Sequence, residues 1–434
     1  MARLRRGDLP PRLAGATPGP RSRRLSRTLA RFEAPGINTL PPGGGPTLVW
    51  EEALGANVLD VDGNRYVDLT GGFGVAALGH RPPAVVAAVR RQAGLLVHGL
   101  GDVHAHPLRA RLAARLARLA PVDEAQVYFA ISGADAVEIA LKSALLATGR
   151  RRLLAFTPAY HGLTLGALSV TARDLFRKPF AHRLAPDVEH LPHGCPPATL
   201  AARLAAGPPV AAVVVEPIVG REGILVPPAG WVAAVAAACR EHGALLVADE
   251  ILTAFGRTGA RFAVDHDRVR PDLLCCGKAL AGGLPLAAVV GRREVLAAWD
   301  RGGEALHTAT FVAHPLACAA ALAALPRLTS ARLLARVGRL GAEAGARLAA
   351  WPERFPAVTA VRGKGLLWGV ELRDGATADR AVAAARDRGV LWLAGGPEGR
   401  VAQIIPPLTI AARQLAAALD RLEEALAAAG PSPA

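Results

Sequence analysis

Two residues suited to amine chemistry lie 29 positions apart, each just after a short apolar run. Asp249 follows the run 243–248, and Lys278 comes shortly after the run 272–276. The chain holds only four lysines against 47 arginines. Lysine becomes a nucleophile when burial or nearby charge lowers its pKa, whereas arginine stays protonated. Lys278 is therefore a candidate for amine chemistry, with an ordinary loop lysine as the alternative.

Three segments place further chemistry-bearing residues at the ends of apolar runs. Ser132, Gly133 and Ala134 open a helical pattern, and the amides of such a helix start can bind phosphate. An ordinary helix cap is the alternative there. Tyr160 follows another run, where its ring can lie on a flat ligand or simply fill the core. Asp249 ends a strand expected to be buried on both sides, so its carboxylate needs a partner, either a protonated ring nitrogen or an arginine.

Considered together, these residues match the parts of one ligand. In chain order they provide a phosphate site, an aromatic ring to stack on a ligand, a carboxylate at a strand end and an isolated amine. Pyridoxal 5′-phosphate has a phosphate, a ring face, a pyridinium nitrogen and an aldehyde carbon to meet them. The sequence therefore predicts a pyridoxal-phosphate site.

The elements that must position these residues alternate between strand and helix. Apolar runs predict strands at residues 126–131, 153–157, 210–215, 244–248, 272–276 and 285–291. Helical patterns occur at residues 83–96, 108–119, 134–148, 199–206, 231–242 and 315–328. Such alternation is typical of an α/β fold with a largely parallel central sheet. Ligands in these sheets bind at the carboxyl ends of strands, where Ser132, Asp249 and Lys278 fall.

Four segments are expected along the chain. The Arg-rich residues 1–31 are predicted to be a disordered tail, because their prolines interrupt any long helix. Residues 32–74 are assigned to a small domain and include a hairpin within 47–69 that turns at 61–64. Residues 75–330 form the large cofactor-binding domain. Residues 331–434 complete the small α+β domain, with helices at 331–350, 377–388 and 411–429, strands at 365–372 and 401–405, and Thr377 as a helix N-cap.

Composition argues against several other classes of protein. The net charge of +15 is spread along the chain without interleaved aromatic residues, so a nucleic-acid partner is not expected. No run of about 18 apolar residues occurs, so no membrane span is expected. The five cysteines lack metal-ligand spacing, and the adjacent Cys275 and Cys276 suit a reduced, buried strand. These features predict a cytoplasmic protein without a metal site.

The ordered motifs resemble those of the class III (ω-type) pyridoxal-phosphate aminotransferases of fold type I, over about residues 47–429. The motifs are Asp60-Val-Asp-Gly63, Gly79-His80, Ser132-Gly-Ala-Asp-Ala-Val-Glu138, Tyr160-His-Gly162, Val215-Glu-Pro217, Asp249-Glu250, Phe255-Gly-Arg-Thr-Gly259, Pro271-Asp272, Lys278, Thr310-Phe311, Arg362-Gly363 and Pro406-Pro407-Leu408. Three segments are most similar to the putrescine-type diamine branch: Phe176-Arg-Lys-Pro-Phe180, His307-Thr-Ala-Thr-Phe311 and Arg362-Gly-Lys-Gly365. The resemblance implies a large domain with a mainly parallel sheet and a smaller α+β domain.

The resemblance also implies a role for each cofactor residue. Lys278 holds the cofactor as a Schiff base and later moves protons, and Asp249 keeps the pyridine nitrogen protonated. Tyr160 and Ile251 enclose the ring. The other cofactor residues are Ser132, Gly133 and Ala134 at the phosphate, Thr310 from a neighbouring subunit at the same phosphate, and His161 and Glu216 nearby. A phosphate site shared between subunits implies a homodimer or a dimer of dimers.

The chain departs from this family at positions that contact the substrate. Leu163 stands where many members have an arginine for the carboxylate of γ-aminobutyrate or ornithine. Gln403 stands where many have an arginine for the keto acid, and Arg221 where some have a glutamate. We expect Arg221, with Gln403 beside it, to bind the carboxylate of the keto acid; an Arg221 that faces solvent is the alternative. Phe73 and Leu163 complete the expected substrate residues.

These features predict an enzyme that moves an amino group from an ω-amine or amino-acid donor to a 2-keto acid by a ping-pong mechanism. Leu163 argues against γ-aminobutyrate and ornithine as preferred donors. Diamines, diaminobutyrate-like acids and other ω-amines remain open. A same-fold aminomutase, racemase or decarboxylase is one alternative, and a basic protein that keeps the fold without catalysis is another.

Overall fold

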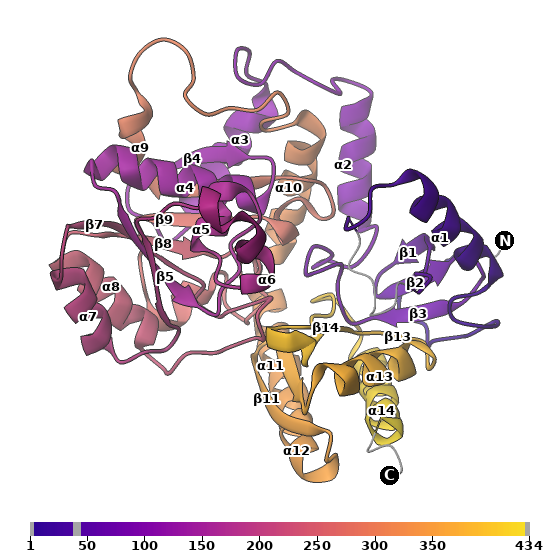
Figure 1. Ribbon diagram of the computed structural model, residues 1–434. Coiled ribbons are helices and arrows are strands. Elements are labelled where there is room, and N and C mark those ends of the chain that lie inside the picture. The colour runs from indigo at the N-terminus through magenta and orange to yellow at the C-terminus, as the bar shows by residue number, and fades with distance from the viewer. Residues whose placement is uncertain (1–3, 38–44, 430–434) are drawn as a thin grey trace. The chain divides into compact units, whose positions relative to one another are not determined.

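The chain folds into two compact units (Figure 1). The computed structural model describes residues 4–37 and 45–429. Pro83–Gly338 form one unit, called here the large unit; Met1–Pro82 with Arg339–Ala434 form the other, the small unit. The sequence places the divisions after residues 74 and 330, whereas the units divide after Pro82 and after Gly338, the latter inside helix α11 (Ala331–Ala349).

A seven-stranded sheet forms the centre of the large unit, with the strand order β4-β10-β9-β8-β7-β5-β6. Its strands are β4 (Ala125–Ala130), β5 (Arg152–Thr157), β6 (Val188–Pro192), β7 (Val210–Val215), β8 (Leu245–Asp249), β9 (Leu273–Cys276) and β10 (Ala287–Arg292). β10 runs antiparallel to both neighbours, and the other pairings are parallel. The predicted α/β fold with a mainly parallel sheet is confirmed. Every residue of β7 is buried, as parallel strands covered on both faces require.

The helices of the large unit include every one expected from the sequence, with ends that differ by a few residues. They are α2 (Pro83–Ala93), α3 (Pro107–Leu119), α4 (Gly133–Thr148), α5 (Leu165–Val170), α6 (Asp174–Arg177), α7 (Pro197–Ala205), α8 (Trp231–Glu241), α9 (Arg293–Leu296) and α10 (Pro315–Leu328). The predicted strands are present as well. β6 was not predicted, because its edge position leaves only Leu191 buried in a mixed sequence.

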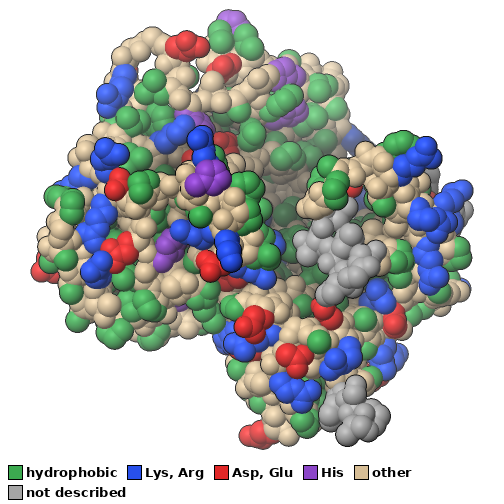
Figure 2. All heavy atoms as spheres, viewed as in Figure 1, with side chains coloured by type: hydrophobic (Ala, Val, Ile, Leu, Met, Phe, Trp, Pro, Cys, Tyr) green, Lys and Arg blue, Asp and Glu red, His purple; other side chains and the backbone are tan. Residues whose placement is uncertain are grey.

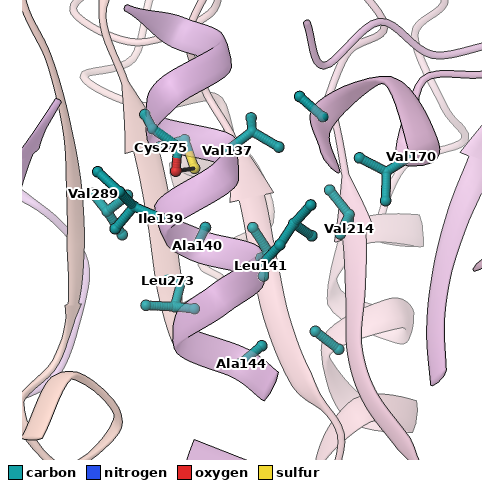
Figure 3. Packing of buried hydrophobic residues seen from close by; sticks show 14 of the residues in the cluster. Val137, Ile139, Ala140, Leu141, Ala144, Val170, Val214, Leu273, Cys275 and Val289 are labelled. Carbon is teal, nitrogen blue, oxygen red and sulfur yellow. Dashed lines mark hydrogen bonds between the residues drawn. The ribbon is translucent and has the colours of Figure 1, made fainter. Parts of the chain in front are cut away.

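Helix α4 packs on the central sheet and carries one of the site segments at its first turn. Figure 3 shows Val137, Ile139 and Ala140 of α4 among apolar side chains of the strands, which include Val214, Leu273, Cys275 and Val289. Burying one Val, Ile or Leu side chain contributes about 1.5–3 kcal/mol. This apolar layer therefore fixes the start of α4, at Ser132 and Gly133, relative to the strand ends.

The small unit contains two four-stranded sheets. One has the order β1 (Trp50–Leu54), β2 (Asn57–Asp60), β3 (Arg65–Asp68) and β13 (Val390–Leu391). The other has the order β11 (Val358–Lys364), β12 (Leu367–Leu372), β15 (Val401–Ile404) and β14 (Leu393–Gly395). Its helices are α1 (Pro20–Phe32), α12 (Trp351–Arg354), α13 (Gly375–Arg386), α14 (Ala412–Ala428) and the part of α11 that follows Gly338.

The hairpin predicted near residues 61–64 is confirmed by the antiparallel pairing of β2 with β3. The Asp60 carboxylate fixes its turn. One oxygen accepts the N–H groups of Asp62 at 2.9 Å and Asn64 at 2.8 Å, and the other accepts the Tyr66 hydroxyl at 3.0 Å. A short carboxylate at this position satisfies turn amides that would otherwise lack partners.

The prediction of a disordered tail over residues 1–31 is wrong for the described residues 4–31. Helix α1 begins at Pro20, where the fixed φ of proline suits the first helical position instead of breaking the helix. The Asp62 carboxylate accepts the N–H groups of Arg21 at 2.7 Å and Ser22 at 2.9 Å, which caps that helix start. Upstream, Arg12 pairs with Arg65 in an isolated β-bridge. Residues 1–3 lie outside the described part.

A second local prediction was also wrong. Thr377 was expected to cap α13, but the N-cap is Asp374, whose carboxylate accepts the Thr377 N–H at 2.7 Å. Both residue types cap helices, and the ionised carboxylate is the stronger acceptor.

The large unit carries charges of both signs on its surface and holds the cysteines in its interior. On the face of the large unit seen at the left of Figure 2, basic side chains are interspersed with acidic and apolar ones. All five cysteines are free and buried. Within residues 4–37 and 45–429, no single helix is long and apolar enough to cross a membrane; the pair Pro315–Leu328 and Ala331–Arg354, bent by 65°, passes that test jointly on length and composition.

Candidate active site

Lys278 follows β9 and begins a single 3-10 turn, Lys278–Ala281. Its φ of +38° lies in the left-handed region, which costs a non-glycine residue strain of a kind that clusters at functional sites. Burial lowers the pKa of Lys278; the carboxylates of Asp249 and Glu216 oppose that shift, and the charges of Arg221 and Arg257 add to it. A lowered pKa increases the fraction of neutral amine, the form able to attack a carbonyl carbon.

Asp249 ends β8, the strand beside β9 in the sheet, and it is buried. One carboxylate oxygen lies 2.7 Å from Nδ1 of His161, and the other accepts the N–H of Ile251 at 3.0 Å. Burial lowers the pKa of His161, but the hydrogen bond and charge of Asp249 outweigh it, so the pKa of His161 is raised. His161 thus donates from Nδ1 and fixes the orientation of the Asp249 carboxylate.

Glu216 follows β7 and places a second buried carboxylate in the same region. Its two oxygens accept the N–H groups of Tyr160 at 2.9 Å and Gly220 at 2.8 Å. Burial raises its pKa to about 7; His161 opposes this and the charge of Asp249 adds to it. Glu216 therefore links the segment after β5 to the loop after β7 and responds to the charge of its neighbours.

The turn between β4 and α4 has the form of a phosphate site. Ser132 is the N-cap of α4, and its hydroxyl accepts the N–H of Asp135 at 3.1 Å. The amides of Gly133 and Ala134 stand in the first helical turn, where N–H groups have no intrahelical partner and the helix dipole favours an anion. A Cβ added at Gly162 would stand 2.6 Å from the Ala134 side chain, so only glycine allows this close approach.

Ile251 packs between two of the site loops. A Cβ built on Gly133 or on Gly277 would lie 3.0 Å from an Ile251 methyl carbon. The same residue follows Asp249 directly, so its side chain sits beside both the phosphate-type turn and the lysine loop. This location suits the ring contact expected of Ile251, which remains a prediction.

Tyr160 is half-buried and belongs to an aromatic pair. Its ring meets Phe176 of α6 edge to face, with ring centroids 5.8 Å apart. The Arg221 guanidinium lies over both rings, 4.7 Å from the centroid of Tyr160 and 5.3 Å from that of Phe176. Burial raises the pKa of Tyr160, which keeps its hydroxyl protonated at neutral pH.

The expected residues divide between the two units. The large unit holds the cofactor-site residues described above. It also holds Leu163 and Thr310, both exposed. The small unit holds Phe73, which is 56% exposed with a φ of +57°, and Gln403, buried on β15. Their roles toward a substrate remain predictions.

Three residues near the site were not expected there. Phe176 completes the aromatic pair, Arg257 is buried and acts on the charge of Lys278, and Glu138 caps a neighbouring helix. One Glu138 oxygen accepts from Thr164 at 2.6 Å and from Gly166 at 2.9 Å, at the start of α5. Of these three residues, only Arg257 has a local signal in the sequence, because it lies in the glycine-rich motif 255–259.

These residues fit pyridoxal 5′-phosphate. The helix start with its glycine-only approach suits the phosphate, the buried carboxylate held by His161 suits a protonated ring nitrogen, and the amine with lowered pKa suits the aldehyde. All of them stand at or just past the ends of β4, β5, β7, β8 and β9, within one unit. An electrophilic cofactor held at such a place defines a carbonyl–amine chemistry.

Comparison with known proteins shows the family of the chain. The family described as aminotransferase class-III matches residues 41–426, and the chain belongs to that family. It is a pyridoxal-phosphate-dependent transaminase of fold type I. The family, fold, enzyme class and cofactor predicted from sequence are confirmed.

Several relatives have names that concern ornithine compounds. An acetylornithine aminotransferase of Methanopyrus kandleri is 40% identical over 87% of this chain and 93% of its own length. One of Mycobacterium bovis is 41% identical over 86% of this chain and 90% of its own. The putrescine-type branch assignment remains a prediction.

Solved structures give the same picture of the fold. The ornithine aminotransferase of Toxoplasma gondii ME49 aligns with a TM-score of 0.85 and 30% identity over 93% of this chain and 94% of its own. An amine transaminase from an uncultivated Pseudomonas species, in its pyridoxal-phosphate-bound form, aligns with a TM-score of 0.83 and 31% identity. The alignment covers 92% of this chain and 99% of that one.

Proposed function

We propose that this transaminase takes its amino group from an ω-amine donor and passes it to a 2-keto acid. The observation that carries the proposal is the partly buried amine of Lys278, subject to the charges of Asp249 and Glu216, at a strand end. The family match supports transamination, and the donor class rests on the residues that follow.

Each residue has a defined task in this reaction. Pyridoxal phosphate, when bound, supplies an electron sink for the electron pair of a broken C–H bond. Lys278 would hold the cofactor covalently, and its free amine would act as the general acid and base that moves the proton of the donor carbon. Asp249 would face the ring nitrogen and favour its protonated form, and the His161 hydrogen bond orients the Asp249 carboxylate. The first-turn amides at Gly133 and Ala134 bind the phosphate.

The donor class is argued from Leu163. This residue follows the segment 160–162 and is 50% exposed, so an apolar side chain stands at a loop next to the site. Leucine offers no charge or hydrogen bond to a donor carboxylate. Diamines and other ω-amines without a carboxylate at that end are therefore the preferred donors, with diaminobutyrate-like acids next.

A second candidate donor is N-acetylornithine. It is favoured by the names of the relatives that are 40% and 41% identical to this chain over most of its length. It belongs in the same screen as the diamines, because both present a terminal amine to the site.

The active form is proposed to be a homodimer or a dimer of dimers. Exposed apolar side chains follow α2, among them Leu95 at 75% and Val103 at 65%, and Phe311 is 60% exposed. The two segments are adjacent, since the rings of His98 and Phe311 lie 5.4 Å apart. Large exposed apolar patches commonly mark interfaces. Thr310 beside Phe311 would then reach the phosphate of a second copy.

The test begins with the covalent attachment. Borohydride reduction of the purified holoenzyme should fix the phosphopyridoxyl group on a peptide that contains Lys278, as seen by mass spectrometry. Lys278→Ala should abolish this labelling and lower the rate of amine conversion by at least about 100-fold. Lys178→Ala, a matched lysine on an exposed turn, should behave as the wild type. Labelling elsewhere would overturn the role of Lys278.

The donor is tested by single-turnover spectroscopy of the holoenzyme with putrescine, diaminobutyrate, N-acetylornithine, ornithine and γ-aminobutyrate. Diamines should convert the cofactor fastest. A preference for ornithine or γ-aminobutyrate would contradict the argument from Leu163. Amino-acid formation in equal amount to the keto acid consumed separates a transaminase from an aminomutase, racemase or decarboxylase, none of which needs a keto-acid acceptor.

A further inference from the structure

His307 connects two charged residues on one side of α4. Its Nε2 lies 2.9 Å from Oδ1 of Asp135, and its Nδ1 lies 3.0 Å from Nζ of Lys142. Asp135 and Lys142 are about two helical turns apart, so their side chains lie on the same side of the helix. One imidazole from a distant segment of the chain thus contacts α4 at its first turn and again further along.

The lysine determines which nitrogen of the His307 ring carries the proton. An ammonium group has donors only, so Nδ1 of His307 accepts from Lys142. A neutral imidazole has one N–H, which then stands on Nε2, the atom that faces Asp135. His307 therefore donates to the Asp135 carboxylate as a neutral ring, and the positive charge of Lys142 stands on the other side of that ring.

Both the ring and the backbone of His307 are anchored. The Tyr128 hydroxyl, on β4, donates to the His307 carbonyl at 2.5 Å. The His307 ring lies 6.3 Å from the ring of Trp299 and 6.5 Å from that of Tyr128, between centroids. The side chains of His307 and Asp135 are only 16% and 20% exposed, so water screens this pair less than a surface pair. The imidazole is therefore fixed in place beside α4.

Asp135 is an acid in the first turn of the helix whose amides are proposed to bind phosphate. Its Oδ2 accepts the N–H of Ile131 at 2.9 Å, and its own N–H donates to the Ser132 hydroxyl. An unrestrained carboxylate here would be attracted to the positive end of the helix. It would compete with a phosphate for the same N–H groups and repel the phosphate charge. The bonds to His307 and Ile131 engage both carboxylate oxygens outside that turn.

We propose that His307 is a positioning residue for the cofactor phosphate. With Lys142 on its other side, its imidazole holds the Asp135 carboxylate so that the first-turn amides of α4 stay available to a phosphate dianion. This inference rests on the proposed function, which places pyridoxal phosphate at that turn. His307 acts on the phosphate through Asp135 and not by direct contact.

The experiment compares the affinity of the apoenzyme for pyridoxal 5′-phosphate and for pyridoxal, which lacks the phosphate. In His307→Ala, the dissociation constant for pyridoxal 5′-phosphate should rise about 5- to 30-fold, the range for a partly buried charge at a helix N-terminus, while that for pyridoxal should change less than about threefold. His307→Gln should recover most of the affinity, because its amide can donate to Asp135 and accept from Lys142. His182→Ala, an exposed histidine in the same unit, is the matched control.

A double-mutant cycle tests the route through Asp135. In Asp135→Asn, which has no charge to hold, adding His307→Ala should weaken binding of pyridoxal 5′-phosphate less than about threefold further. A full loss in that background would mean that His307 acts by another route, such as the segment that leads to Thr310, and overturns the proposal.

The comparison of the two ligands separates positioning from a general structural role. Equal losses of affinity for pyridoxal 5′-phosphate and pyridoxal in His307→Ala overturn the proposal, since damage to the fold affects both. An unchanged affinity for pyridoxal 5′-phosphate also overturns it. A wild type that binds the two compounds equally would in addition overturn the phosphate site of the proposed function.

Discussion

Nδ1 of His161 lies 2.7 Å from a carboxylate oxygen of Asp249, in the buried part of the large unit. The two residues are 88 positions apart and come from segments that follow β5 and end β8. Their hydrogen bond and charge attraction raise the pKa of His161 against the opposing effect of burial. His161 therefore orients the Asp249 carboxylate, which we propose faces the ring nitrogen of the cofactor.

Replacement of His161 by alanine should weaken cofactor binding. Asp249 would keep only the N–H of Ile251 as a donor, and a hydrogen bond to a charged group is worth about 1.5–3 kcal/mol. The dissociation constant for pyridoxal phosphate should rise about 10- to 100-fold, measured by titrating the apoenzyme and following absorbance. His182→Ala, an exposed histidine in the same unit, serves as control. Equal affinities in the wild type and His161→Ala would show that Asp249 is held without this contact.

Gly162→Ala should damage both the fold and the phosphate site. The new methyl group would stand 2.6 Å from the side chain and 2.9 Å from the Cα of Ala134, at a φ of +129°. Gly149→Ala is a matched control, because that glycine has a φ of +66° but no atom within 4 Å of the added Cβ. Left-handed strain should lower its free energy of unfolding by roughly 1–2 kcal/mol. In Gly162→Ala, overpacking should lower the free energy of unfolding by about 1–3 kcal/mol more than in Gly149→Ala.

The affinity for the cofactor is the second property to compare between Gly162→Ala and Gly149→Ala. Gly162→Ala displaces the first turn of α4, so its affinity for pyridoxal phosphate should fall, whereas that of Gly149→Ala should not. Chemical denaturation of the two apoenzymes gives the stability difference, and cofactor titration gives the affinity. Equal losses in both variants would mean that the approach of Gly162 to Ala134 is not needed.

Much of the fold follows from local patterns in the sequence, and the exceptions have physical reasons. β7 was predicted at its observed residues because all six side chains are buried, which leaves an unbroken apolar run. α10 begins at Pro315, as predicted, because proline suits a first helical turn. β6 was missed because a sheet-edge strand needs few apolar residues. α1 was missed because Pro18 and Pro20, just before and at its start, resemble helix breakers, while the Asp62 cap comes from another segment.

Some features of the candidate site also follow from local sequence patterns, and others depend on tertiary packing. The positions of Lys278 and Asp249 at strand ends could be predicted from sequence, because apolar strands in α/β sheets are recognisable and ligands bind at their ends. The bond between His161 and Asp249 depends on how β5 and β8 are placed in the sheet, which local pattern does not give. The position of Arg221 over Tyr160 depends equally on tertiary packing. The sequence thus identifies the proposed reacting groups, whereas their contacts depend on tertiary packing.

Glu216→Gln should shift the acid limb of the pH–rate profile to lower pH. The charge of Glu216 raises the pKa of Lys278, so its removal lets burial lower that pKa further. Lys278 would then remain a neutral base at more acidic pH. The measurement is the pH profile of the single-turnover rate with a saturating diamine. Glu241→Gln, an exposed glutamate on α8, should leave the profile in place. An unmoved acid limb in Glu216→Gln would contradict the coupling.

Glu250→Gln should stabilise the protein at alkaline pH. Glu250 is fully buried; burial raises its pKa to about 7 from 4.5, although hydrogen bonds from Thr253 and Val264 oppose the shift. A raised carboxyl pKa means that the folded state binds the proton more tightly than the unfolded chain does. The contribution of Glu250 to stability is therefore most favourable at low pH and is lost as the pH rises from about 4.5 to about 7. Glutamine can accept from the Val264 amide and donate to the Thr253 hydroxyl without carrying a charge.

The size of this effect follows from the shift of the Glu250 pKa. A pKa raised from 4.5 to about 7 corresponds to up to about 3 kcal/mol of unfolding free energy at pH 8, and to roughly half of that at pH 5.5. Urea denaturation of wild type, Glu250→Gln and the exposed control Glu241→Gln at both pH values measures it. The gain should be larger at pH 8 than at pH 5.5 and absent in the control. A variant that is destabilised equally at both pH values would show that the Glu250 hydrogen bonds matter more than its buried charge.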